Sequence, residues 1–182
     1  MKRCLVVCTA LKSDGKTHTL ARAMAQSLAA LDVEVDLMDL ATEPLPACDG
    51  ASCYADPAVK AATERVKRAA MVVICSPIYN YQVNAAAKNF VELTNAGWPD
   101  KIVGVVVCAG GDRSYLAVLS LANSLWLDHH CLLAPRFVYA TGAAFGENGT
   151  LRVESDVGAR LHSLAADLRR LAVALAPAEL SA

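Results

Sequence analysis

A polar segment follows the first apolar run of the chain and has the composition of an anion-binding loop. It reads Thr-Ala-Leu-Lys-Ser-Asp-Gly-Lys-Thr over residues 9–17, and a helical pattern begins at its end. A helix N-terminus presents free backbone N–H groups and a partial positive charge. The side chains that would add donors or charge are Thr9, Lys12, Ser13, Lys16 and Thr17. The segment indicates a phosphate site, although a plain helix start with solvated lysines has the same composition.

Two common nucleotide motifs are excluded for this segment. Gly15-Lys16-Thr17 matches the end of a Walker loop, but position 10, where that motif requires glycine, is alanine. The three glycines of the dinucleotide fingerprint are also absent.

A second segment combines aromatic rings with amide groups. After the apolar run that ends at Ser76, the chain continues with Pro77, Ile78, Tyr79, Asn80, Tyr81, Gln82 and Val83. Proline directly after a strand stops it and fixes the turn. Aromatic faces and amide groups suit a flat heterocycle with hydrogen-bonding edges. A stabilising turn whose tyrosines cap the core is the alternative.

A third segment carries two adjacent glycines, Gly110 and Gly111, followed by Asp112 and Arg113. Adjacent glycines let the backbone approach a ligand closely and turn its N–H groups toward it. A flexible connection without a ligand would have the same sequence.

The elements around these segments alternate between strands and helices. Continuous apolar runs predict buried parallel strands, over Cys4–Thr9, Val33–Leu40, Met71–Ser76, Ile102–Ala109 and Leu132–Ala140. Apolar residues at a period of about 3.6 predict helices, over Thr17–Leu31, Asp56–Ala70, Ala85–Ala96, Tyr115–Leu127 and Asp156–Leu175. The alternation predicts an α/β fold: a doubly wound, five-stranded parallel sheet in a three-layer sandwich.

The three polar segments each follow a strand of this predicted sheet. In such sheets ligands bind beyond the carboxyl ends of the strands. Each segment is weak evidence alone, whereas their common placement predicts one binding site.

Composition sets the class of protein. The 182 residues fit one domain over 1–182, with a frayed tail at 177–182. A net charge of −1 and the lack of a long apolar run predict no nucleic-acid or membrane partner. The short apolar run near the start indicates a first strand rather than a signal peptide. We therefore expect a cytoplasmic protein whose seven cysteines are reduced, with Cys4, Cys8, Cys75, Cys108 and Cys131 in the core.

On these motifs the chain resembles the NAD(P)H-dependent FMN reductases, a family of flavodoxin-like proteins. The most specific match is Ser76-Pro77-Ile78-Tyr79-Asn80 with Lys88-Asn89-Phe90 at its proper distance, and Gly110-Gly111-Asp112-Arg113 is a second. The resemblance in element order spans roughly residues 3 to 175. The family usually has serine near Ala10 and arginine near Lys12, and a lysine lacks the planar fork of arginine.

The resemblance implies FMN as cofactor and NAD(P)H as co-substrate. Thr9, Lys12, Ser13, Lys16 and Thr17 would hold the phosphate, residues 77–83 would line the flavin ring, and Gly110, Gly111 and Arg113 would lie at its pyrimidine end. The flavin would pass a hydride from nicotinamide to a quinone, flavin, azo or similar acceptor, with no catalytic side chain and no metal. A homodimer or homotetramer is implied, and Ala85–Leu93 and Tyr115–Leu127 are the expected contacts.

Two rival interpretations stay open. Cys48 and Cys53 suggest an iron–sulfur flavoprotein, but a cluster normally needs four thiolates, so a reversible disulfide or an incidental pair is favoured. The second rival interpretation is a flavodoxin-type electron carrier without turnover. Such carriers tend to be strongly acidic, whereas this chain has a net charge of −1. His129 and His130 are expected at a solvated helix end rather than in a site.

Overall fold

The computed structural model describes residues 2–176, so the predicted frayed tail at 177–182 lies outside the described residues. Its parallel sheet is built from β1 (Arg3–Cys8), β2 (Glu34–Asp39), β3 (Met71–Tyr79), β5 (Ile102–Ala109), β6 (Leu132–Leu133) and β7 (Val138–Thr141). The order across the sheet is β2-β1-β3-β5, with β6 and β7 both paired to the outer side of β5. Because β6 and β7 pair with successive parts of β5 and occupy one position in the sheet, this order confirms the predicted five-stranded parallel sheet.

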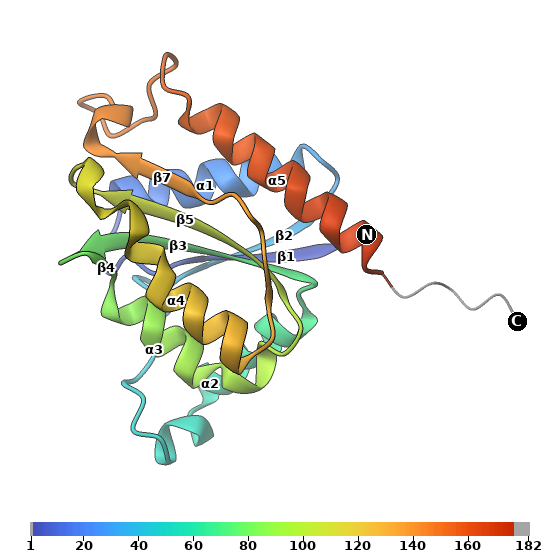
Figure 1. Ribbon diagram of the computed structural model, residues 1–182. Coiled ribbons are helices and arrows are strands. Elements are labelled where there is room, and N and C mark those ends of the chain that lie inside the picture. Colours follow the sequence, from blue (N-terminus) through green and yellow to red (C-terminus); the bar gives the residue numbers. More distant parts are fainter. Residues whose placement is uncertain (1, 177–182) are drawn as a thin grey trace, which may run out of the picture.

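Helices cover both faces of this sheet (Figure 1). The helix α1 (Lys16–Ala29) and the helix α5 (Val157–Ala174) lie on one face. The other face carries α2 (Pro57–Arg68), α3 (Ala85–Leu93) and the short α4 (Leu119–Asn123). The arrangement confirms the predicted three-layer sandwich.

Alternation along each strand divides the core into two clusters. In β1, Cys4, Val6 and Cys8 pack under α1 and α5, while Leu5 and Val7 pack on the opposite face. Because both faces are covered, every second residue is apolar on each side and the strand is continuously apolar. This explains why the sequence shows runs rather than a clean alternation.

The third strand is longer than predicted. The strand β3 continues through Pro77, which pairs with Cys108 of β5, and ends at Tyr79. The next residues turn back as the short strand β4 (Gln82–Val83), antiparallel to β3. Pro77 therefore does not stop the strand, because proline is tolerated near the end of a strand, where its missing N–H breaks few ladder bonds.

Two other elements are broken where the sequence predicts continuity. The predicted strand 132–140 divides into β6 and β7 around Pro135, which cannot donate to the ladder. The predicted helix 115–127 consists of a 3₁₀ segment (Asp112–Val118), α4, and a π-turn (Ser124–Asp128). The 3₁₀ geometry continues to Val118, so the regular α-helix begins at Leu119 instead of at the predicted Tyr115.

The expectation for the strand cysteines is confirmed, whereas that for His129 is wrong. Cys4, Cys8, Cys75, Cys108 and Cys131 are all buried free thiols, and burial raises the pKa of Cys8 and of Cys131 to about 11. His129 is also buried and packs against Trp98 with ring centroids 6.5 Å apart. The π-turn before it carries His129 inward, so it is not a solvated helix end.

None of the helices in the described part of the chain is both long enough and apolar enough to cross a membrane.

Candidate functional site

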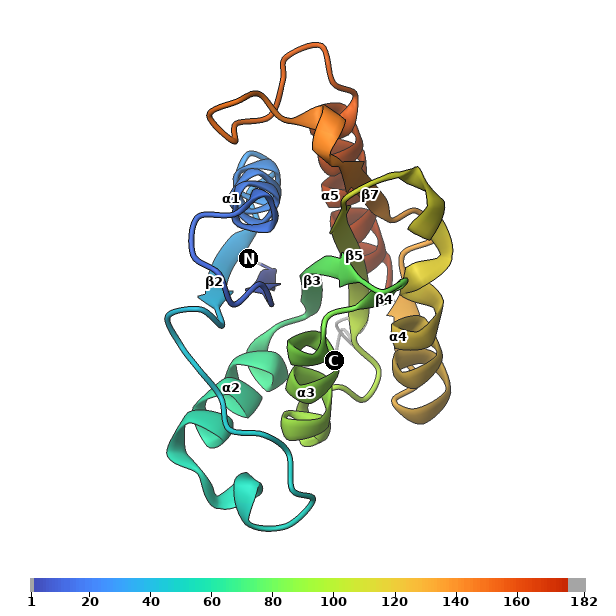
Figure 2. The same cartoon turned by 90° about the vertical axis from the view of Figure 1, so that its left-hand side faces the viewer.

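The three predicted segments meet at the carboxyl edge of the sheet. Figure 2 views this edge end-on, with the loop before α1, the β3–β4 hairpin and the loop after β5 surrounding the ends of the central strands. The segment after β7 lies beside the start of α1 in the same view. The topological switch point lies between β1 and β3, which is where sheets of this strand order bind ligands.

A buried asparagine joins the first two segments. The side chain of Asn84 donates from Nδ2 to the carbonyl oxygen of Thr9 at 2.6 Å. Its Oδ1 accepts from the hydroxyl groups of Thr9 at 2.8 Å and of Ser76 at 3.1 Å, and from the N–H of Ala87 at 3.2 Å. The Thr9 hydroxyl is therefore used inside the protein. The backbone N–H of Thr9 is also used, because it donates to the carbonyl oxygen of Cys75 at 2.9 Å. A ligand contact for Thr9 stays a prediction.

The loop before α1 carries unused hydrogen-bond donors. The backbone N–H groups of residues 11–13, 16 and 17 have no acceptor within the part of the chain that the structure describes. Gly15 caps α1 without a side-chain hydrogen bond. Lys12 and Ser13 are exposed beside these donors, whereas Thr17 is buried. Free N–H groups at a helix N-terminus with nearby positive charge suit an oxyanion.

Lys16 lies between this loop and the end of the sheet. Its Nζ is 5.6 Å from the centroid of the Phe145 ring. Gly142 is also close, since a Cβ atom added to this glycine would be 3.2 Å from the same Nζ. Burial raises the pKa of the Cys108 thiol, and the nearby Lys16 charge opposes that rise. Lys16 therefore brings its charge close to the end of β5, at the centre of the carboxyl edge.

The β3–β4 hairpin has a strained turn with exposed tyrosines. Asn80 and Tyr81 form its two-residue loop with φ of 49° and 63°, as in a type I′ turn. Asparagine tolerates this conformation, but at Tyr81 it costs about 1 kcal/mol or more. Tyr79 and Tyr81 are each 60% exposed, and Gln82 is exposed as well. Pro77 and Ile78 are buried beneath them, and Val83 is half-buried.

Tyr139 of β7, which the sequence did not single out, supports the loop after β5. Its hydroxyl group donates to the carbonyl oxygen of Gly111 and accepts from the N–H of Ser114 at 3.3 Å. A Cβ at Gly110 or Gly111 would have no heavy atom within 4 Å, so packing does not require glycine there. The open space beside these glycines suits the close approach of a ligand. Arg113 is exposed on the same loop.

The sequence also missed a group beside the first loop, formed by the buried Cys8 and His18 and the half-buried Asp39. The Nε2 of His18 lies 3.0 Å from Oδ1 of Asp39, and the donor atoms of all three residues lie within 4.8 Å of one another. These donor types can bind zinc, but His18 and Asp39 already satisfy each other. The Nδ1 of His18 is buried without a partner among the described residues, and it would be 4.0 Å from a Cβ at Gly15.

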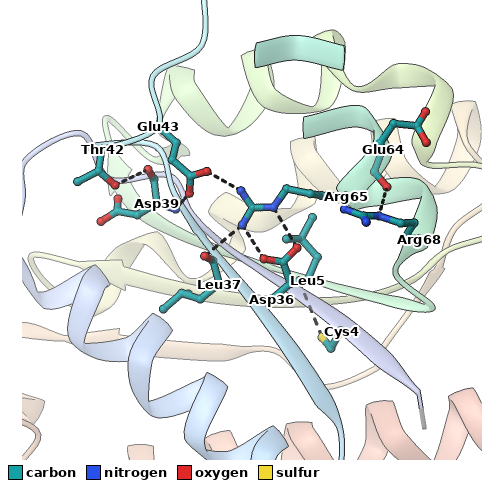
Figure 3. Close-up of polar contacts among 10 residues, drawn as sticks. All are labelled: Cys4, Leu5, Asp36, Leu37, Asp39, Thr42, Glu43, Glu64, Arg65 and Arg68. Atoms are coloured by element: carbon teal, nitrogen blue, oxygen red, sulfur yellow. Dashed lines mark hydrogen bonds and ion pairs between the residues drawn. The ribbon is translucent and has the colours of Figure 1, made fainter. Parts of the chain in front are cut away.

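The turn that presents Asp39 is held by Arg65 of α2 (Figure 3). The guanidinium group donates two hydrogen bonds to Asp36, at 2.6 and 3.0 Å, and one to Glu43 at 2.6 Å. Glu43 in turn accepts from the N–H of Asp39 at 3.3 Å. These contacts fix the end of β2 against the helix layer. The residue types alone do not predict these contacts, because the side chains come from elements far apart in the sequence.

The donor set of the edge fits FMN. Unpaired N–H groups with two lysines match a phosphate group, and exposed tyrosines beside open glycine backbone match a flat ring system with polar edges. The five-stranded parallel order with its ligand loops after β1, β3 and β5 defines the class of flavodoxin-like flavoproteins.

Comparison with known proteins gives the family. Residues 2–146 match the model of the NADPH-dependent FMN reductases, so the chain belongs to that family. It is also 32% identical, over 130 residues and 70% of each chain, to an NADPH azoreductase of Bacillus sp. (strain OY1-2).

Solved structures agree on the fold. FerB, an NAD(P)H:(acceptor) oxidoreductase from Paracoccus denitrificans, is 21% identical with a TM-score of 0.73, covering 93% of this chain and 98% of FerB. RosB, solved with 8-demethyl-8-formylriboflavin-5'-phosphate, is 17% identical with a TM-score of 0.76, covering 96% of this chain and 80% of RosB. Family membership supports an NADPH-dependent oxidoreductase with FMN as cofactor, and it does not favour a carrier without turnover.

Proposed function

We propose that the carboxyl edge holds FMN and that the chain reduces a quinone, flavin or azo compound there at the expense of NAD(P)H. The observation that carries this proposal is the group of unpaired backbone N–H donors in residues 11–17, next to Lys12 and Lys16. Residues 11–13 and 16 are exposed, so their N–H groups are open to the oxygen atoms of a phosphate at the helix N-terminus. The azo alternative draws on the 32% identical relative, whose name is NADPH azoreductase.

Each loop has a separate task in this proposal. The amides of residues 11–13, 16 and 17 bind the phosphate, and Ser13 adds a hydroxyl donor. Tyr79 and Tyr81 cover one side of the ring system and exclude water from it. The backbone of Gly110 and Gly111, with Arg113, faces the pyrimidine end. Bound FMN supplies the hydride chemistry, so these residues only bind and orient.

A comparison of FMN with riboflavin tests the phosphate assignment. Lys12→Gln and Lys16→Gln are each expected to weaken FMN binding about tenfold, a loss of about 1.4 kcal/mol. Riboflavin, which lacks the phosphate, should bind all variants equally. Lys60→Gln on the exposed side of α2 is the matched control. If riboflavin binding falls in step with FMN binding, these lysines do not contact the phosphate. NADPH oxidation with an added quinone or azo dye then measures turnover.

We also propose that two or four copies associate through the surface around α4. Its exposed apolar side chains are Tyr115, Leu116, Leu119, Trp126, Leu127 and Leu132. Exposed apolar patches of this kind mark interaction sites. The helix α3 contributes less than the sequence suggested, because its apolar residues Phe90, Val91 and Leu93 are buried in its own chain. Trp126→Lys should shift the mass measured by light scattering toward that of a monomer, whereas an unchanged mass would contradict this surface.

The cytoplasm is the proposed compartment. All seven cysteines are free thiols in the structure, and free thiols persist in reducing compartments.

A further inference from the structure

Cys48 and Cys53 differ from the other five cysteines in position and access. The other five are buried in the two core clusters of the sheet. Cys48 and Cys53 lie in the loop between β2 and α2, which extends beneath α2 and α3 in both views (Figures 1 and 2). Their Sγ atoms are 3.9 Å apart. Cys48 is half-buried and Cys53 is 6% exposed.

The loop holds the two thiols together before any bond forms. The Asp49 carboxylate accepts from the N–H groups of Ala51 at 2.9 Å and of Cys53 at 3.0 Å, and from the Ser52 hydroxyl. These hydrogen bonds, the one from Ser52 first, hold the pKa of Asp49 well below its usual range. Gly50, with φ of +71°, closes the turn in a conformation that glycine adopts without strain.

The backbone of Cys48 is anchored separately to α3. Its N–H donates to Oδ1 of Asn89 at 2.8 Å, and Nδ2 of Asn89 donates to the carbonyl oxygen of Pro46 at 2.8 Å. The two cysteines are therefore held from opposite sides. A disulfide needs the sulfur atoms to approach from 3.9 Å to about 2.05 Å, a movement within reach of side-chain rotation and a small loop shift.

Only Cys48 of the pair lines a cavity that a small molecule could enter. A cavity of about 440 Å³ is lined by Cys48 and Tyr54, together with Lys88 and Glu92 of α3 and His129. Cys53 does not line this cavity. Burial and the neighbouring Asp49 carboxylate raise the pKa of the Cys53 thiol. A small molecule therefore reaches Cys48 first, and Cys53 stays protonated behind it.

We propose that Cys48 and Cys53 form a redox-active pair that exchanges with small-molecule disulfides of the glutathione type. The Cys48 thiolate attacks one sulfur of the disulfide, forming a mixed disulfide and releasing the first thiolate. Cys53 passes its proton to the released thiolate and attacks the Cys48 sulfur, which forms the intramolecular disulfide and breaks the bond to the second thiolate. The two cysteines are oxidised together and one small disulfide is reduced to two thiols.

The pair is separate from the proposed FMN site. It shares no residue with the loop before α1, the β3–β4 hairpin or the loop after β5, and the loop that carries it extends beyond α2 and α3, away from the sheet (Figure 2). The exchange does not depend on bound flavin, so it can be tested whether or not FMN binds.

Mass spectrometry after incubation with glutathione disulfide tests the proposal. The folded protein is equilibrated, desalted, and alkylated with N-ethylmaleimide in denaturant. The wild type should lose two alkylatable thiols per chain and carry no glutathione. Cys53→Ser should carry one glutathione on Cys48, because no second thiol releases it. Cys48→Ser should carry none, because Cys53 is not accessible.

The double variant Cys48→Ser/Cys53→Ser is the matched control and should keep all five remaining thiols free. Three results would overturn the proposal. The wild type could keep all of its thiols, or it could retain glutathione without closing the disulfide. The double variant could also lose thiols as fast as the wild type, which would place the reaction at the core cysteines. Reduction by dithiothreitol should restore the wild-type thiols, showing that the bond is reversible.

Discussion

The centre of the sheet and its carboxyl edge differ in how their residues fit the fold. In the centre, residues such as Val6, Val73 and Leu168 are fully buried, and the apolar pattern agrees with the fold at each position. At the edge, backbone donors and a buried nitrogen of His18 lack partners among residues 2–176, and Tyr81 occupies a strained conformation. Places where local rules fail are expected to be functional. The difference indicates that the centre supplies stability and the edge supplies binding.

The largest expected effect is a loss of stability from a substitution in the centre of the sheet, with no change in binding at the edge. Leu168 of α5 is fully buried, and one of its methyl groups would be 3.0 Å from a Cβ at Gly104. Leu168→Ala should lower the free energy of unfolding by roughly 2–5 kcal/mol, because it leaves a cavity. Urea denaturation measures this loss. The FMN dissociation constant of the folded variant should not change, and a parallel loss of affinity would show that the two regions are coupled.

The second expected effect lies where the two regions join. Asn84→Ala removes the side chain that holds Thr9 and Ser76, and it leaves the buried Thr9 carbonyl without its 2.6 Å donor. We expect a stability loss of about 1–3 kcal/mol, together with weaker FMN binding, because both loops lose their common support.

Asn95→Ala, at an exposed position just after α3, is the control for that variant and should change neither quantity. Equal FMN affinity in the Asn84 variant and the wild type would mean that the loops keep their geometry without this hub. The geometry of the loops at the edge would then depend on their backbone alone.

The same difference explains what the sequence could predict. The strand Ile102–Ala109 was predicted with its observed bounds because an apolar run needs only local information. The three segments of the proposed site could be placed at one edge of the sheet because each follows such a run. The hairpin at Asn80 and Tyr81 was missed because Pro77 suggested a stop, and the sequence near Tyr81 lacks the glycine typical of this turn.

Other parts of the edge depend on contacts that no local pattern records. His18 meets Asp39 across α1 and β2, and Tyr139 meets Gly111 across β7 and the loop after β5. Each pair joins residues at least 20 positions apart, and of these four residues only Gly111 stands in a recognisable motif. The predicted helix over 115–127 failed for a related reason, since its leucine spacing alone does not show the 3₁₀ and π geometry.

The smallest expected effect comes from Tyr81, where a substitution should change stability and FMN binding in opposite directions. Tyr81→Gly should raise the free energy of unfolding by about 1 kcal/mol, because glycine adopts a positive φ without the steric cost that tyrosine has there. FMN binding should weaken at the same time, because the exposed ring is lost. Thermal denaturation and flavin fluorescence measure the two quantities on one sample.

Asp32 provides the matched control for Tyr81, because it also has a positive φ, 57°, but follows α1 at the opposite end of the sheet. Asp32→Gly should stabilise the protein by less, because aspartate adopts a positive φ at a lower cost than tyrosine, and it should leave FMN affinity unchanged. If both variants gain stability and only Tyr81→Gly loses affinity, the strain at the hairpin exists because the tyrosine side chain is needed there. If neither loses affinity, the turn is strained without serving the flavin, and the contrast between centre and edge then depends on the unpaired donors of residues 11–17.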